Sequence, residues 1–138
     1  MSNRKGFTLI EIIVVLVIIA ITSMIAIPSY LAFMKKGESQ SAWNNLIAIY
    51  AAEKNYYLNN GNYCTGSALS SDCGYSLANI NAGLSLTIPA DSYFTYQCTG
   101  SLFCYAQARD GTFGYVVTGT LPLSSTNPAC SYGACPTW

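Results

Sequence analysis

The sequence predicts an α+β protein in which one long amino-terminal helix packs on a small antiparallel sheet. Three observations support this fold class. Residues 7–27 are almost wholly apolar, residues 28–60 continue with apolar side chains three and four positions apart, and residues 93–120 combine β-forming side chains with turn signals. We therefore expect a spine helix of about 50 residues, followed by a disulfide-stabilised globular head at 61–138.

The apolar run at 7–27 is long enough to cross a bilayer. At about 1.5 Å per residue it spans roughly 31 Å as a helix, which matches the hydrocarbon thickness of a membrane. Its one ionisable side chain is Glu11. A carboxylate inside an apolar segment is costly and generally has a partner. We therefore expect a membrane segment that also makes a specific polar contact through Glu11.

The beginning of this run resembles a known family. Residues 4–11 read RKGFTLIE and lead directly into the apolar run. This pattern resembles the amino terminus of type IV pilins and of the related pseudopilins of type II secretion. The resemblance implies the type IV pilin fold, a leader peptide at residues 1–6 that a prepilin peptidase removes by cutting between Gly6 and Phe7, and methylation of the new amino group of Phe7. It covers residues 4–63 by motif and the rest of the chain by architecture only.

Glu11 is the residue expected to set the register between subunits. Phe7 and Glu11 are four positions apart, so they lie on the same face of a helix. After cleavage, Glu11 of one subunit could reach the amino group of Phe7 on the next subunit. Because an unpaired charge in apolar surroundings is expensive, this pairing would favour one axial register.

The second half of the spine, residues 28–60, is expected to be an amphipathic helix. Pro28 lacks a backbone donor and predicts a kink. The helix should end at Asn59-Asn60-Gly61, where Asn or Gly supplies a left-handed cap. The predicted apolar face consists of Tyr30, Leu31, Met34, Ala42, Leu46, Ile49, Tyr50, Tyr56 and Tyr57.

The head is expected to contain three parts. Residues 62–91 form a loop with little periodicity, in which residues 84–88 alternate like a short strand. An antiparallel sheet follows at about 93–120, with a hairpin turn at Asp110. A carboxy-terminal disulfide loop occupies residues 121–138. One face of the sheet should cover the amphipathic half of the spine helix.

All six cysteines lie in the head, and an even number in an exported domain predicts disulfides. The count allows several connectivities, but the cysteines fall into three local pairs. We expect these pairs to be Cys64–Cys73, Cys98–Cys104 and Cys130–Cys135.

Metal sites are weaker alternatives for this chain. A zinc site is disfavoured because the sequence contains no His and no C-x2-C pair. A structural calcium in the head would have to draw on Asp72, Asp91 and Asp110, which are few for an ion that takes six to eight oxygens. A turn role for Asp110 is preferred.

The composition also argues against catalysis and nucleic-acid binding. No Ser-His-Asp or Cys-His set, metal cluster or phosphate loop is present, so we expect no catalytic residues, no metal and no cofactor. Without residues 1–6, four basic side chains remain against six acidic ones. This balance gives no strong nucleic-acid signature.

The resemblance implies a non-enzymatic structural subunit, the major pilin of a type IV pilus used for adhesion, twitching motility or DNA uptake. Its partners would be copies of itself in a helical filament, the prepilin peptidase and the pilus assembly machinery. The precursor and subunit pool would lie in the inner membrane, and the assembled filament outside the cell. A minor pilin or type II secretion pseudopilin is one alternative. A monomeric membrane-anchored binding domain, held by an uncleaved signal anchor, is another.

Overall fold

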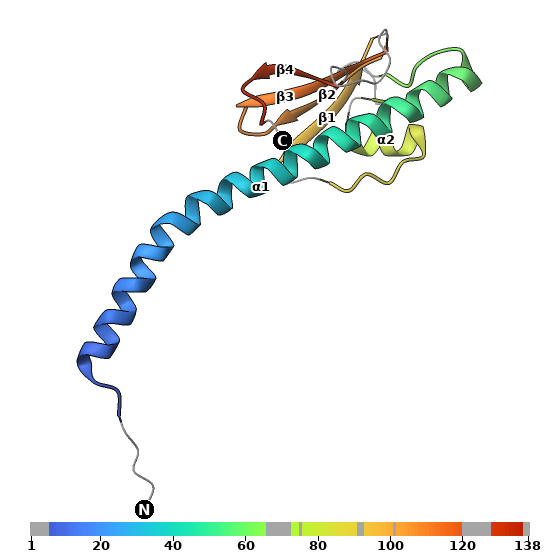
Figure 1. Ribbon diagram of the computed structural model, residues 1–138. Helices are drawn as coiled ribbons and strands as arrows, with labels where there is room; N and C mark the ends of the chain where they lie inside the picture. Colours follow the sequence, from blue (N-terminus) through green and yellow to red (C-terminus); the bar gives the residue numbers. More distant parts are fainter. Residues whose placement is uncertain are drawn as a thin grey trace, which may run out of the picture. The chain divides into compact units, whose positions relative to one another are not determined.

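The computed structural model describes residues 6–65, 73–74, 76–90, 93–100, 102–119 and 128–136. Its elements, in chain order, are α1 (Leu9–Asn60), α2 (Leu77–Leu84), β1 (Phe94–Thr99), β2 (Phe103–Ala108), β3 (Phe113–Thr118) and β4 (Ala129–Gly133) (Figure 1). The chain divides into two units, one ending at Lys35 and the other beginning at Lys36. The predicted fold class, a long helix with a small antiparallel sheet and disulfides, is confirmed.

The long helix α1 follows the predicted spine closely. It continues on both sides of Pro28 and ends at Asn60. Gly61 has a φ of 75°, and its N–H donates to the Tyr57 carbonyl at 2.8 Å. The left-handed cap predicted at the end of the spine is therefore confirmed. The kink at Pro28 stays a prediction.

The carboxy-terminal half of α1 buries one stripe of side chains. Its members are Ser39, Ala42, Leu46, Ile49 and Glu53. Their spacing of three and four residues places them on one face of the helix. Ala42, Leu46 and Ile49 belong to the predicted apolar face. Tyr57, also assigned to that face, is 43% exposed, because the buried stripe ends at Glu53.

The head contains a four-stranded antiparallel sheet in the order β1-β2-β3-β4. Successive strands are neighbours, so the sheet is a simple meander. The turn between β2 and β3 contains Asp110 and Gly111, as predicted. Asp110 accepts hydrogen bonds from the Thr112 backbone and hydroxyl at 3.0 and 2.7 Å, and Gly111 has a φ of 70°. These contacts make Asp110 a turn residue.

The head core lies between the second half of α1 and one face of the sheet (Figure 1). Each of the first three strands contributes alternate buried side chains, as expected for a sheet with one covered face. Aromatic rings fill the centre of the core. The ring centres of Phe94 and Phe113 lie 5.7 Å apart, and those of Trp43 on α1 and Tyr115 on β3 lie 5.6 Å apart in an edge-to-face arrangement. Such pairs stabilise the core beyond their buried area.

The predicted loop at 62–91 is wrong in part, because it contains α2. The Ser76 side chain caps this helix by accepting a hydrogen bond from the Asn79 N–H. Ile80, within the helix, is fully buried. The strand suggested at 84–88 does not form. The Asn81 side chain bonds both the N–H and the carbonyl of Ile88, at 3.1 and 2.8 Å, and so takes the backbone groups that a neighbouring strand would need.

The carboxy-terminal loop was also predicted without regular structure, whereas residues 129–133 form β4 on the edge of the sheet. Its side chains are mostly exposed, so it lacks the alternation that marks a half-buried strand. A register shift against β3 at Gly114 and Tyr115 weakens the pattern further.

The three disulfides are Cys64–Cys73, Cys98–Cys104 and Cys130–Cys135, the pairs expected from local spacing. Cys98 and Cys104 are also register partners on β1 and β2. The first bridge closes the segment after α1, and the third closes the end of β4. The second bridge lies in the core, where Cys98 and Cys104 are both fully buried.

The core stripe yields a stability prediction. Leu46 is fully buried, so Leu46→Ala should lower the free energy of unfolding of the head by about 2–5 kcal/mol. Denaturant unfolding of the full chain in detergent, followed by tryptophan fluorescence, measures this loss. Leu58→Ala on the same helix is the matched control, because Leu58 is 82% exposed. Equal losses in the two variants would contradict the packing described here.

Candidate functional site: the amino-terminal apolar segment

The start of α1 is fixed by a reciprocal pair of side chains. Glu11 Oε2 accepts from the Thr8 N–H and from Thr8 Oγ1, both at 3.1 Å, while the Glu11 N–H lies 3.4 Å from Thr8 Oγ1. This is the capping box of a Thr-x-x-Glu sequence, which satisfies donors that the first helical turn leaves open. The predicted site residue Glu11 therefore also has a local role within its own chain.

Sequence reasoning assigned no role to Thr8, although the signal was present. Thr at the residue before a helix and Glu three positions later form a recognised start pattern. Glu11 stands out as the one charged residue in an apolar run, so its spacing of three residues from Thr8 is the less conspicuous signal. Thr8 belongs to the site because it holds one carboxylate oxygen of Glu11 in place.

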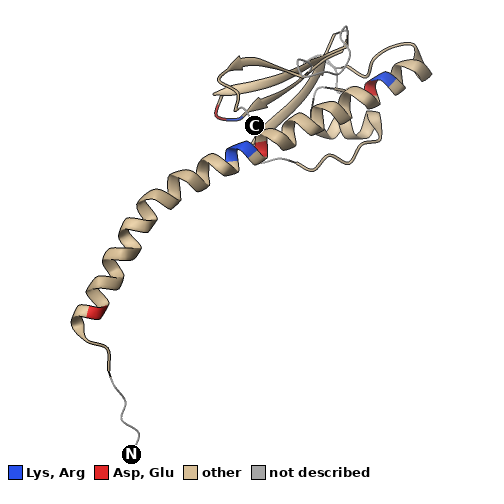
Figure 2. Cartoon of the chain, in the orientation of Figure 1, with Lys and Arg blue, Asp and Glu red and all other residues tan. Residues whose placement is uncertain are grey.

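The surface of α1 between Leu9 and Met34 is apolar and exposed. Ile13 is 47% exposed and Met24 81%, and no charged side chain occurs between Glu11 and Lys35 (Figure 2). Within the described residues, α1 contains a segment long and apolar enough to cross a membrane by length and composition, and none of that segment is buried. Such a surface is stable only against lipid or other apolar helices.

The aliphatic hydroxyl groups of this segment, on Thr22, Ser23 and Ser29, bond to their own helix. Thr22 Oγ1 donates to the Ile18 carbonyl at 2.9 Å, and Ser23 Oγ donates to the Ile19 carbonyl at 2.7 Å. Ser29, beside Pro28, does the same to Ile25 at 3.1 Å. These three hydroxyl hydrogens are satisfied without water, which suits a helix surrounded by apolar material.

The other predicted residues of this segment are only partly described. Gly6 and Phe7 precede the helix, and Phe7 is 82% exposed. Arg4 and Lys5 lie outside the described residues. The proposed cleavage position between Gly6 and Phe7 thus adjoins the capping box, two residues before α1 begins.

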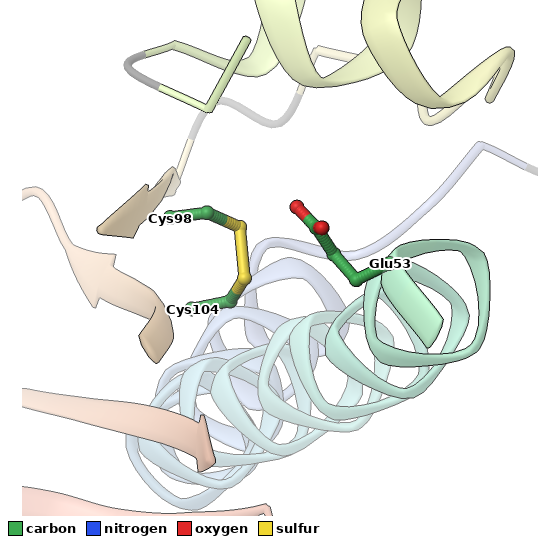
Figure 3. A group of neighbouring side chains, drawn as sticks. All are labelled: Glu53, Cys98 and Cys104. Atoms are coloured by element: carbon green, nitrogen blue, oxygen red, sulfur yellow. A yellow bond between two sulfur atoms is a disulfide. The ribbon is translucent and has the colours of Figure 1, made fainter. Parts of the chain in front are cut away.

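A second group of potential ligands lies inside the head. Glu53, Cys98 and Cys104 have ligand atoms within 4.8 Å of one another, and all three residues are buried (Figure 3). The two sulfur atoms are joined in a disulfide, so neither is a thiolate that could bind a metal. This cluster is therefore better described as a buried carboxyl group beside a disulfide.

The residues considered for calcium do not assemble a described site. Both oxygens of Asp110 are engaged, Oδ1 with Thr112 and Oδ2 with the Tyr93 hydroxyl at 2.8 Å. Asp72 and Asp91 lie outside the described residues. The geometry around Asp110 supports its role in the turn.

Comparison with known proteins connects this geometry to a family. The family model for the prokaryotic N-terminal methylation motif matches residues 1–27. The type IV major pilin protein PilA of Myxococcus xanthus is 38% identical over 61 residues, which cover 44% of this chain and 28% of that pilin. The type IV wide pilus major component PilA4 of Thermus thermophilus is 28% identical over 130 residues, covering 94% and 92% of the two chains.

A secretion protein is similar over a stretch of comparable length. The type II secretion system core protein G of Klebsiella pneumoniae is 34% identical over 65 residues, or 47% of this chain and 46% of that protein. The match thus spans less than half the length of the Myxococcus and Klebsiella relatives, and almost all of the Thermus one. No solved structure matches the chain.

The capping box yields a local prediction. Thr8→Val removes the hydroxyl that bonds Glu11, so we expect the first turn of α1 to lose about 1 kcal/mol of protection. Amide hydrogen exchange at Glu11, measured on the full chain in detergent, should become about fivefold faster. Thr8→Ser keeps the hydroxyl and should exchange like the unaltered chain. Identical exchange in the Val and Ser variants would refute the capping role.

Proposed function

We propose that this chain is a type IV pilin and the major structural subunit of a type IV pilus. The observation that carries the proposal is the exposed, charge-free apolar surface of α1, which begins at the Thr8–Glu11 capping box. The similarity to the Thermus wide pilus component along nearly the whole chain supports the same conclusion. Relatives of this family are structural proteins, which fits a subunit without catalytic activity.

The apolar segment would serve two successive environments. In the inner membrane it would hold the precursor and the subunit pool, and in the filament it would pack against the same segment of neighbouring copies. Lipid chains and apolar helices are similar surroundings, so the transfer itself need cost little, and side-chain packing then decides. An external motor of the assembly machinery would supply the work.

Glu11 would direct this packing. Its Oε2 is held by Thr8, while Oε1 has no hydrogen-bond partner among the described residues. A prepilin peptidase cutting between Gly6 and Phe7 would create an amino group at Phe7, which is then methylated. The open oxygen of Glu11 is suited to bind this amino group on the neighbouring subunit. Because only one axial offset brings the two charges together, the pair would set the register.

A minor pilin or type II secretion pseudopilin is the second candidate, favoured by the similarity to the secretion core protein G. Abundance separates the two. If the chain is a major pilin, fibres sheared from the cells should consist mostly of it, and mass spectrometry should find it without residues 1–6 and with a methylated Phe7. Sheared fibres that contain only traces of the chain would favour the second candidate. A chain that keeps residues 1–6 would be a membrane-anchored monomer instead.

The register role of Glu11 yields a separate prediction. Glu11→Ala leaves the partner amino group unpaired in apolar surroundings, at a cost of about 3–5 kcal/mol per subunit. We expect the yield of sheared fibres to fall at least about tenfold, with the membrane pool intact on immunoblots. Glu38→Ala, which removes a half-buried carboxylate from the same helix outside the apolar segment, is the control and should leave the yield unchanged. Normal yield and geometry in the Glu11 variant would disprove the register role.

A further inference from the structure

Glu53 is a fully buried carboxyl group that the filament role does not use. It is the last member of the buried stripe on α1 and has no solvent exposure. Its Oε2 accepts a hydrogen bond from the Cys64 N–H at 2.9 Å. Its Oε1 is buried and has no hydrogen-bond partner among the described residues. A buried acceptor left in this state calls for an explanation, because it has lost its water without gaining a partner.

Among the residues that the structure describes, the neighbours of Glu53 offer it no opposite charge. Figure 3 shows the carboxyl group directed from α1 toward the Cys98–Cys104 disulfide of β1 and β2, and neither half-cystine titrates. Helix α2 contains no charged residue. Asp72, which precedes Cys73 in the sequence, lies outside the described residues.

The nearest cation along α1 is directed elsewhere. Lys54 Nζ donates to the Tyr63 hydroxyl at 3.2 Å and to the Gly119 carbonyl at 2.9 Å. It also lies 5.5 and 5.6 Å from the ring centres of Tyr50 and Tyr63. This ammonium fastens the segment after α1 to the end of β3 and forms no ion pair with Glu53 among the described contacts.

Burial therefore dominates the ionisation of Glu53. Loss of water raises its pKa from 4.5 to about 7, and the hydrogen bond from the Cys64 N–H opposes this rise because it favours the anion. The neutral acid is compatible with the surrounding core. The anion would have one oxygen facing apolar atoms and sulfur, which is costly without a counter-ion.

We propose that Glu53 is a proton-dependent latch, which as a neutral acid holds the backbone at Cys64 against α1 and the head core and as an anion loosens it. The segment is attached here at three points: the Cys64 N–H on Glu53, the Cys64–Cys73 disulfide, and the Cys98 N–H, which donates to the Gly74 carbonyl at 2.7 Å. Because Glu53 has no solvent exposure, water can reach the ionised carboxylate only if part of the surrounding head moves. The folded head is then most stable at acidic pH and becomes less stable as the pH rises toward neutral.

The direction of the pH effect follows from linkage. The folded head binds the Glu53 proton more tightly than the unfolded chain, whose carboxyl groups titrate near 4.5. The stabilisation is therefore complete below pH 4.5 and is lost as the pH rises through about 7. Between pH 5 and pH 8 the unfolding equilibrium constant should rise on the order of 100-fold from this group alone.

Direct titration of the carboxyl group is the first test. The chain has three glutamates, Glu11, Glu38 and Glu53, so ¹³C-carboxyl glutamate labelling of the full chain in detergent gives few signals. The Glu53 signal is identified as the one that remains in both Glu11→Gln and Glu38→Gln, so no Glu53 variant is needed. We expect its midpoint near pH 7. A midpoint below about 5.5 would overturn the proposal, since an unshifted carboxyl titrates near 4.

Stability measurements form the second test. Denaturant unfolding of the full chain in detergent should show that the head is less stable at pH 8 than at pH 5. In Glu53→Gln, which cannot ionise, most of this dependence should disappear, whereas the matched control Glu38→Gln should keep it. Amide exchange at Cys64 should be faster at pH 8 than at pH 5, after correction for intrinsic exchange, only in chains with Glu53. An unchanged pH dependence in Glu53→Gln would also overturn the proposal.

Discussion

The structure depends on one constraint: the apolar side chains of α1 between Leu9 and Met34 must be kept from water. Within the described residues these side chains are exposed, so material outside the chain has to cover them. The local chemistry of the segment is consistent with such a cover. The hydroxyl groups of its Thr and Ser residues bond to their own helix, and one oxygen of its single carboxylate is engaged at the first turn. Bonds of this kind reduce the number of polar groups that need water, which favours a position in lipid or among other helices.

The head meets the opposite requirement, because it has to be stable in water with few charges. It achieves this by covering the second half of α1 with three strands whose inner faces are aromatic and aliphatic. Disulfides close two further parts of the head, Cys64 to Cys73 and Cys130 to Cys135. A short covalent ring lowers the conformational entropy of the unfolded chain. It thereby stabilises a small domain whose core contacts are few. The same helix therefore serves two environments, and the change in its side-chain pattern after Met34 marks where one ends.

The elements that could be predicted from sequence are those with strong periodicity or strong turn residues. The spine helix, its end at Gly61 and the hairpin at Asp110 belong to this group. Helix α2 could not be predicted from periodicity, because one buried residue, Ile80, and a serine cap are too little signal in eight residues. Strand β4 lies at the edge and is exposed, so its order comes from backbone pairing with β3, which leaves no mark on the side-chain pattern.

The two glutamates at opposite ends of α1 show why sites are harder to read than elements. Glu11 stands alone in an apolar run, so its cost in that setting is visible in the sequence. Glu53 is followed by Lys54 and Asn55 and looks like part of a solvated face. Only the fold shows that it completes the buried stripe and that Lys54 turns toward Tyr63 and Gly119. A charged residue can therefore be recognised as a site from the sequence when its neighbours in space are also its neighbours in the chain. Glu53 could not be recognised in this way, because Cys98 beside it lies 45 residues further along the chain.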